Sequence, residues 1–196
     1  MPSKLLIAAA DAAHAAQNTA PFGVHVDGEV RIDGKEVMDR VKSERDRFVG
    51  FVVDSVDALP AEDKVLGYAR FLDDHTVQVD DHTQITATSF VIATGSSPFS
   101  PAALEGAGDR LIINDDVFEW DDLPERIVVI GAGVIGLELG QALHRLGVDT
   151  TLLNRSHKVG GITDHEVREA AREAFCCQFT MVANADITQV EREGDE

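Results

Sequence analysis

The stretch RIVVIGAGVIGLELGQALHRLGVDTTLLN constrains the fold of this chain more than any other part of it. An apolar run leads into a turn in which Gly131, Gly133 and Gly136 have the spacing G-x-G-x-x-G. An amphipathic segment through Arg145 and a second apolar run ending at Asn154 follow it. This order predicts a strand, a helix and a second strand, that is, a βαβ unit with parallel strands.

The three glycines predict a dinucleotide-binding turn. Gly131 permits the tight turn, Gly133 lets the backbone approach a pyrophosphate, and Gly136 lets helix and strand pack closely. The N-terminus of the following helix offers free N–H groups and a partial positive charge to the phosphates. A glycine turn that serves packing alone is the weaker alternative, because the strand, helix and second strand are all in place.

The residues after the second strand leave the choice of nucleotide open. An acid is usual at this point, where it binds the adenosine ribose, but this chain has Asn154 followed by Arg155. Asn154 can still form a hydrogen bond with a 2′-hydroxyl, whereas Arg155 could bind a 2′-phosphate or simply face water. The motif is therefore compatible with both NAD and NADP.

The remaining sequence divides into helical and strand-like parts. We expect a helix over residues 3–17 with Leu6, Ala10 and Ala13 on one face. A second helix is expected to be capped by Asp33 or the residues just after it and to end at Pro60. It carries an apolar stripe that we interpret as core: Val37, Val41, Phe48, Val52 and Val56. Short strands are expected in VLGYARFL, TVQVDD and QITATSFVIATG, with FVIAT as a buried strand that ends at Gly95. A helix from Asp164 and a strand near residues 180–182 continue the βαβ unit.

Composition excludes several function classes. The net charge of −18 argues against nucleic acid or an anionic membrane as a partner. No apolar stretch approaches the length of a membrane span and no signal peptide is present, so we expect a cytoplasmic protein. The two cysteines, Cys176 and Cys177, are adjacent and badly placed for a disulfide. No metal-ligand motif is found.

Two motifs together resemble a known family. FVIATGSSP followed by IVVIGAGVIGLELG resembles the flavoprotein disulfide reductases, and GAGVIGLELGQALHRLG is most similar to the dihydrolipoamide dehydrogenases among them. In that family a Cys-x4-Cys redox pair stands just before a Pro-Ser-Lys segment. The opening MPSK of this chain resembles the residues after the second redox cysteine, so the resemblance implies a fragment that lacks the flavin-binding glycine motif and the disulfide.

The resemblance implies roles for particular residues. Lys4 corresponds to the lysine beside the flavin ring and Glu138 to the acid that pairs with it, and these two are the expected catalytic residues. Ala69, Thr94 and Gly95 correspond to FAD contacts. The implied contacts of the nicotinamide dinucleotide are Gly131, Ala132, Gly133, Val134, Ile135, Gly136, Asn154, Arg155 and Ile187.

The resemblance also implies the architecture and the activity. The expected fold class is α/β, with incomplete Rossmann-type FAD- and NAD(P)-binding domains that combine a parallel sheet with an antiparallel β-meander. Residues 1–118 would be the C-terminal part of the FAD domain and residues 119–196 the N-terminal part of the NAD(P) domain. The parent would be a homodimer that passes electrons from dihydrolipoyl groups of 2-oxoacid dehydrogenase complexes to NAD. An NADP-linked disulfide or mercuric reductase and a nucleotide-binding module without redox chemistry are the alternatives.

Overall fold

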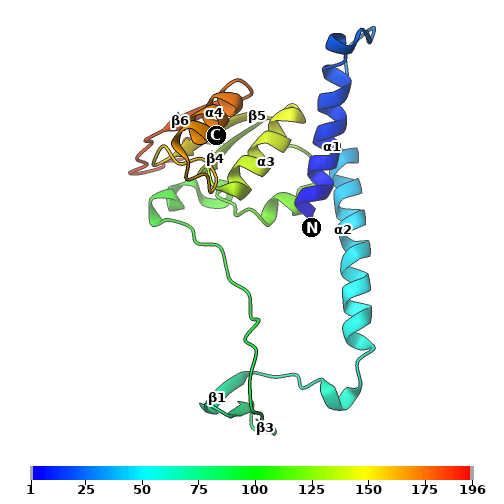
Figure 1. Cartoon of the computed structure of the whole chain (residues 1–196), viewed down its shortest axis with the longest axis vertical. Helices are drawn as coiled ribbons and strands as arrows, with labels where there is room; N and C mark the ends of the chain where they lie inside the picture. Colours follow the sequence, from blue (N-terminus) through cyan, green and yellow to red (C-terminus); the bar gives the residue numbers. More distant parts are fainter. Residues whose placement is uncertain (1, 195–196) are drawn as a thin grey trace. The chain divides into compact units, whose positions relative to one another are not determined.

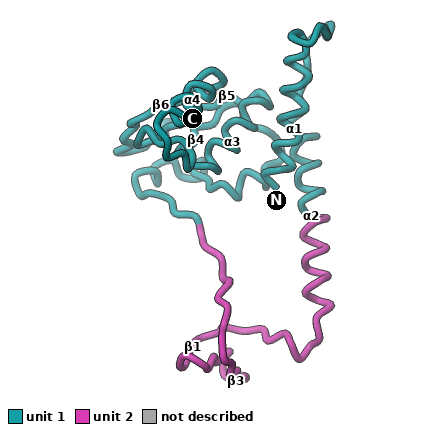
Figure 2. The backbone as a smooth tube through the Cα atoms, viewed as in Figure 1, with its two compact units in different colours: residues 1–46, 98–196 teal, residues 47–97 magenta. Residues whose placement is uncertain are grey.

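The computed structural model describes residues 2–194 of the chain. It has two compact units, which Figure 2 colours separately. The first unit consists of Met1–Asp46 and Pro98–Glu196, and the second of Arg47–Ser97. The predicted domain boundary after residue 118 falls within the first unit. That boundary concerns the domains of a longer protein and stays a prediction.

A three-stranded parallel sheet in the first unit confirms the predicted βαβ order. Its strands are β4 (Arg126–Ile130), β5 (Asp149–Asn154) and β6 (Thr180–Ala183), in the order β4-β5-β6. Helix α3 (Val134–Arg145) connects β4 to β5, and α4 (His165–Cys176) connects β5 to β6. Parallel neighbours require such crossover helices. Figure 1 shows both helices beside the sheet.

The two faces of this sheet are covered differently. Leu152, with Val129 and Met181 beside it in the ladder, packs into an apolar cluster with Leu137 of α3 and Phe179. The opposite face keeps apolar side chains exposed, namely Val128, Ile130 and Val182. Such a surface favours association.

Helix α1 (Pro2–Gln17) packs against α3 through the predicted face. Leu6, Ala10 and Ala13 are buried in one cluster with Leu139 and Leu143 of α3. The alanines let the two helices approach closely, because their side chains add little width. At the edge of this contact Arg145 forms an ion pair with Asp11 at 2.7 Å. Figure 1 shows α1 and α3 side by side.

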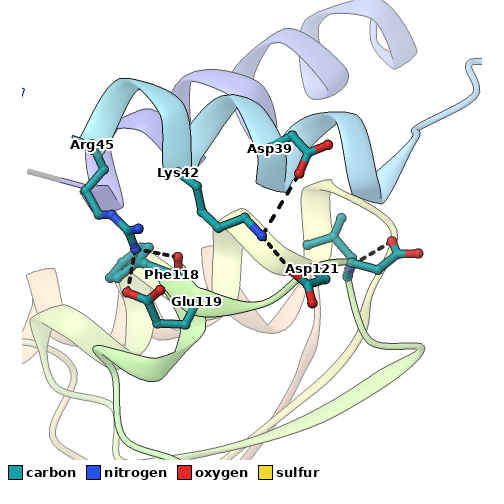
Figure 3. A network of polar contacts seen from close by, with 8 residues as sticks. Asp39, Lys42, Arg45, Phe118, Glu119 and Asp121 are labelled. Carbon is teal, nitrogen blue, oxygen red and sulfur yellow. Dashed lines mark hydrogen bonds and ion pairs between the residues drawn. The ribbon is translucent and has the colours of Figure 1, made fainter. Parts of the chain in front are cut away.

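The first half of α2 (Gly34–Asp57) is held to the segment before β4. Figure 3 shows the network of polar contacts, in which Lys42 binds Asp121 at 2.6 Å and Arg45 donates to the carbonyl oxygen of Phe118 at 2.9 Å. Arg45 also pairs with Glu119. Asp33 caps the helix, as predicted, by accepting from the N–H of Glu36 at 3.3 Å. Short 3-10 helices η1 (Ala20–Phe22), η3 (Ala102–Arg110) and η4 (Asp116–Glu119) complete the first unit.

The apolar stripe predicted along α2 is buried only in part. Val41 is fully buried, whereas Val52 is 64% exposed and Val56 is half exposed. Helical periodicity identifies one apolar face but does not identify what packs on it. The interpretation of the whole stripe as core is therefore wrong for these two residues.

The second unit contains the predicted antiparallel β-meander. Strands β1 (Ala69–Asp73), β2 (Thr76–Val79) and β3 (Thr83–Thr86) pair in sequence order, after the 3-10 helix η2 (Ala61–Asp63). Val77 and Val79 of the central strand are buried. Polar turns separate the strands.

The prediction of a buried strand at FVIAT is wrong. Residues 90–95 have no regular structure, and the side chains of Val91 and Ile92 are 93% and 72% exposed. A strand forms only where a neighbour supplies the other half of the hydrogen-bond ladder. No strand among residues 2–194 pairs with this segment, so its apolar sequence alone does not make it a strand.

No helix among residues 2–194 has the length and apolarity needed to cross a bilayer.

Substituting Leu6 tests the contact between α1 and α3. Leu6→Ala removes a completely buried side chain, so we expect the free energy of unfolding to fall by about 2–5 kcal/mol. Urea denaturation followed by circular dichroism measures this change. Val52→Ala is the matched control, and its effect should stay within about 0.5 kcal/mol. A loss below that level for Leu6→Ala would contradict the packing described here.

Candidate functional site

The glycine turn between β4 and α3 is closed on one side and open on the other. Gly131 has φ +104° and donates its N–H to the carbonyl oxygen of Leu153 at 2.8 Å. A Cβ at Gly136 would lie 2.1 Å from the carbonyl oxygen of Gly131, so only glycine fits there. A Cβ at Gly133 would meet nothing within 4 Å. The open side is where a phosphate group can approach the backbone.

The N-terminus of α3 is available to an anion. Gly133 is the N-cap and no side chain caps the helix, and no acidic residue stands in its first turn. Val134 and Ile135, the first two residues of the helix, are exposed. Uncapped N–H groups and the helix dipole together favour a bound phosphate. This end of α3 fits the pyrophosphate predicted from the sequence.

Asn154, at the end of β5, is engaged within the chain itself. Its Oδ1 accepts from the N–H of Ala132 at 3.3 Å. Its Nδ2 donates to the carbonyl oxygens of Ser156 at 2.7 Å and Lys158 at 2.8 Å. Asn154 therefore links the glycine turn to the loop that follows β5. Its predicted contact with the nucleotide is untested.

The loop after β5 lies beside the glycine turn. Arg155 is exposed, and the N–H of Gly160 donates to the carbonyl oxygen of Ala132 at 2.7 Å. A pocket of about 30 Å³ is lined by this loop, α4 and β6. Ile187, the last predicted nucleotide contact, is partly buried in the segment after β6. Sequence reasoning missed the contact of Gly160, although the pair Gly160-Gly161 signals an irregular loop.

The structure brings Lys4 and Glu138 together, as the resemblance implies. Lys4 extends from α1 and forms an ion pair with Glu138 of α3. Ser3, which sequence reasoning missed, donates its hydroxyl to the same carboxylate oxygen at 3.3 Å. The Lys4 side chain is 72% exposed and that of Glu138 only 22%. The ammonium group of Lys4 is thus bound by Glu138 on one side and accessible to a ligand on the other. Met1 lies outside the described residues.

The pair favours the ionised form of Glu138. The hydrogen bond from the Lys4 ammonium holds the pKa of the Glu138 carboxyl below its usual value of 4.5, and partial burial opposes this effect. Glu138 is therefore ionised at neutral pH. A carboxylate that is partly buried loses contact with water and needs such a partner.

The predicted FAD contacts Ala69, Thr94 and Gly95 lie in the second unit. Ala69 begins β1, and all three residues are exposed. Gly95 has φ +69°, a conformation that favours glycine. Their contacts with flavin stay predictions.

The cysteines and the acidic residues form no metal site or disulfide in the described part of the chain. Cys176 ends α4 and Cys177 follows it, and both thiols are free and exposed. Among residues 2–194, no group of three or more His, Cys, Asp or Glu side chains could hold a metal ion.

The fold and the glycine turn define the class of this protein: an α/β protein with a Rossmann-type dinucleotide-binding unit. A family described as pyridine nucleotide-disulphide oxidoreductase matches residues 1–196. The chain belongs to this family.

Two relatives and one solved structure illustrate the similarity. The chain is 33% identical to a mercuric reductase of Bacillus cereus in an alignment 202 positions long, which covers 100% of the chain and 31% of that protein. It is 37% identical to a soluble pyridine nucleotide transhydrogenase of Vibrio vulnificus over 136 residues, 67% of the chain and 29% of that protein. A mutant of the flavoprotein disulfide reductase RclA of Escherichia coli, solved as a Cu(II) complex, has a TM-score of 0.75 at 16% identity and covers 100% of the chain.

These similarities support the family but not the dihydrolipoyl substrate. The chain spans 41% of the RclA structure and less than a third of either relative. The structural likeness to RclA shows the fold alone, because the identity is low. Oxidoreductase chemistry with FAD and a pyridine nucleotide is the property of the family as a whole. The particular substrate is therefore a separate question.

The residues present fit the groups that the family uses. A Cβ at Gly133 would meet nothing within 4 Å, so the backbone at the uncapped end of α3 is open to an approaching phosphate group. The exposed ammonium of Lys4 is of the right charge for a flavin ring that becomes anionic on reduction. Both sites are in the first unit, on or beside α3.

Substituting Glu138 tests the ion pair through its pH dependence. A carboxyl whose pKa is lowered by folding stabilises the protein above its unfolded pKa, and this stability is lost as the pH falls. Glu138→Gln should reduce the free energy of unfolding at neutral pH by roughly 0.2–1 kcal/mol, because the pair is partly exposed. The difference should shrink progressively as the pH falls below 4.5. Urea titrations at several pH values measure it, and a difference that does not depend on pH would contradict the assignment.

Proposed function

We propose that this chain is the segment of an FAD-dependent pyridine nucleotide-disulphide oxidoreductase that brings the nicotinamide dinucleotide to the flavin. The observation that carries the proposal is the position of Glu138. Glu138 stands two residues after Gly136, in helix α3. The N-terminus of this helix is available to a pyrophosphate, and its residue Glu138 binds Lys4. One rigid element thus links the two cofactor sites.

The chain's own residues have distinct roles in this proposal. Gly131, Gly133 and Gly136 shape the turn that holds the pyrophosphate, and Glu138 orients the Lys4 ammonium. Lys4 places a positive charge beside the ring of FAD. When bound, the flavin supplies the chemistry, because it accepts and gives up a hydride equivalent that side chains cannot carry.

The electron donor in the finer proposal is a dihydrolipoyl group of a 2-oxoacid dehydrogenase complex, with NAD as acceptor. The support is the similarity of GAGVIGLELGQALHRLG to dihydrolipoamide dehydrogenases. We further propose a cytoplasmic homodimer as the full-length form, as in the family that the sequence resembles. The two cysteines of this chain are adjacent at the end of α4. In this proposal the redox disulfide belongs to a part of the protein outside these 196 residues.

An NADP-linked mercuric or disulfide reductase is the second candidate. Two observations favour it: Arg155 is exposed just after β5, and two relatives that match the entire chain are mercuric reductases. The relatives that match two thirds of it include transhydrogenases.

Assays of the full-length gene product separate these candidates. We expect dihydrolipoamide-dependent reduction of NAD and no oxidation of NADPH that depends on Hg²⁺. The opposite result would replace the dihydrolipoyl assignment by that of a mercuric reductase. An absence of bound flavin in the full-length protein would contradict the proposal as a whole.

Gly136→Ala tests the dinucleotide site in the 196-residue chain. The added methyl would lie 2.1 Å from the carbonyl oxygen of Gly131 and would force the turn to open. We expect NADH binding, measured by calorimetry, to weaken at least about tenfold, or 1.4 kcal/mol. Gly50→Ala is the matched control, because a Cβ there meets nothing within 4 Å. Equal affinity of both variants for NADH would contradict the assigned turn.

Arg155→Glu tests the choice of nucleotide. A single exposed charge pair contributes roughly 0.2–1 kcal/mol, which alters a preference by only a few-fold. We expect the native chain to bind NADH at least as well as NADPH, and Arg155→Glu to weaken NADPH selectively. Titrations with both nucleotides measure this. If the native chain binds NADPH about tenfold more tightly, Arg155 anchors a 2′-phosphate and the NADP-linked candidate is favoured.

A further inference from the structure

Asn154 occupies the position from which a Rossmann unit usually contacts the adenosine ribose. In this structure its polar atoms are already engaged. A side-chain amide has two N–H donors and one oxygen acceptor with two lone pairs. Both donors of Asn154 are used on the carbonyl oxygens of Ser156 and Lys158, and Oδ1 accepts from Ala132. At most one lone pair is left for a ligand.

These contacts explain why the residue is an amide. An ionised aspartate at position 154 would accept from Ala132, but it could not donate to the two carbonyl oxygens. It would place a negative charge against both of them. The usual acid is therefore incompatible with this loop, whereas asparagine satisfies all three partners.

The same contacts connect two parts of the nucleotide site. Ala132 lies in the glycine turn and is buried. Both its N–H and its carbonyl oxygen form hydrogen bonds. Its N–H donates to Asn154, and its carbonyl oxygen accepts from Gly160, beyond the loop. The turn that meets the pyrophosphate and the loop of residues 155–158 are thus fixed to one another through Asn154.

We propose that Asn154 is a positioning residue that fixes the glycine turn to the loop of residues 155–158, rather than a ligand of the ribose. This inference rests on the proposed dinucleotide site. It assigns Asn154 an equal effect on every dinucleotide, whatever group is present at the 2′ position. A direct ribose ligand would instead distinguish nucleotides by that group.

Calorimetry with three nucleotides tests this assignment in the 196-residue chain. The ligands are NADH, NADPH and NADH that lacks the 2′-hydroxyl of the adenosine ribose. We expect Asn154→Ala to weaken all three by about tenfold, with the affinity ratios of the native chain retained. A loss confined to NADH would overturn the inference, because it would show that Asn154 and the 2′-hydroxyl interact directly.

Asn18→Ala is the matched control for the loss of an asparagine. Asn18 is exposed at the end of α1, where its amide donates to the carbonyl oxygen of His14 at 2.8 Å. We expect this variant to bind all three nucleotides as the native chain does. A native chain that binds none of them would contradict the proposed dinucleotide site, which is a different outcome from a changed ratio.

Nuclear magnetic resonance of the native chain tests the inference without any substitution. Both side-chain N–H protons of Asn154 should exchange slowly with water, because each donates to a carbonyl oxygen. Their signals should stay unchanged on addition of NADH, while those of the Gly133 and Val134 amides shift. Rapid exchange of the Asn154 amide, or a shift on nucleotide binding as large as that of Gly133, would overturn the inference.

Discussion

The packing of α1 against α3 is the contact on which the candidate site depends. Leu6, Ala10 and Ala13 bring α1 close to α3, and this closeness places Lys4 within reach of Glu138. The ion pair is partly exposed and adds little stability by itself. Apolar burial therefore positions the charges, and the charges do not hold the helices together. Larger side chains at the alanine positions would separate Lys4 from its partner.

Helix α3 combines roles that are often divided among several elements. Its first turn, which no side chain caps, faces the space for a pyrophosphate, and its second turn carries Glu138. Its other face buries Leu139 and Leu143 against α1. A helix is stiff over this length, so the spacing between the phosphate-binding end and the Lys4–Glu138 pair is fixed by the 1.5 Å rise per residue.

The sequence predicted those features that depend on neighbouring residues along the chain. The βαβ unit, the meander and the Asp33 cap follow from local periodicity and turn chemistry, and the structure contains them. The interpretations of FVIAT as a buried strand and of Val52 as core are wrong, because burial depends on distant partners. The Lys4–Glu138 pair could be predicted from the resemblance to a known family. The engagement of Asn154 was not, since residues 132, 156 and 158 meet only in the folded chain.

Local donors have to overcome an unfavourable overall charge when a dinucleotide binds. The chain carries a net charge of −18, and the ligand is itself an anion. At physiological ionic strength the Debye length is about 8 Å, so most exposed carboxylates are screened from a ligand at the turn. In the proposed site, backbone N–H groups at the end of α3 would contact the phosphates directly and be little affected by this screening. The affinity therefore depends on how accurately the glycine turn is held, which is why a neutral amide that fixes Ala132 from β5 can matter more than another positive charge.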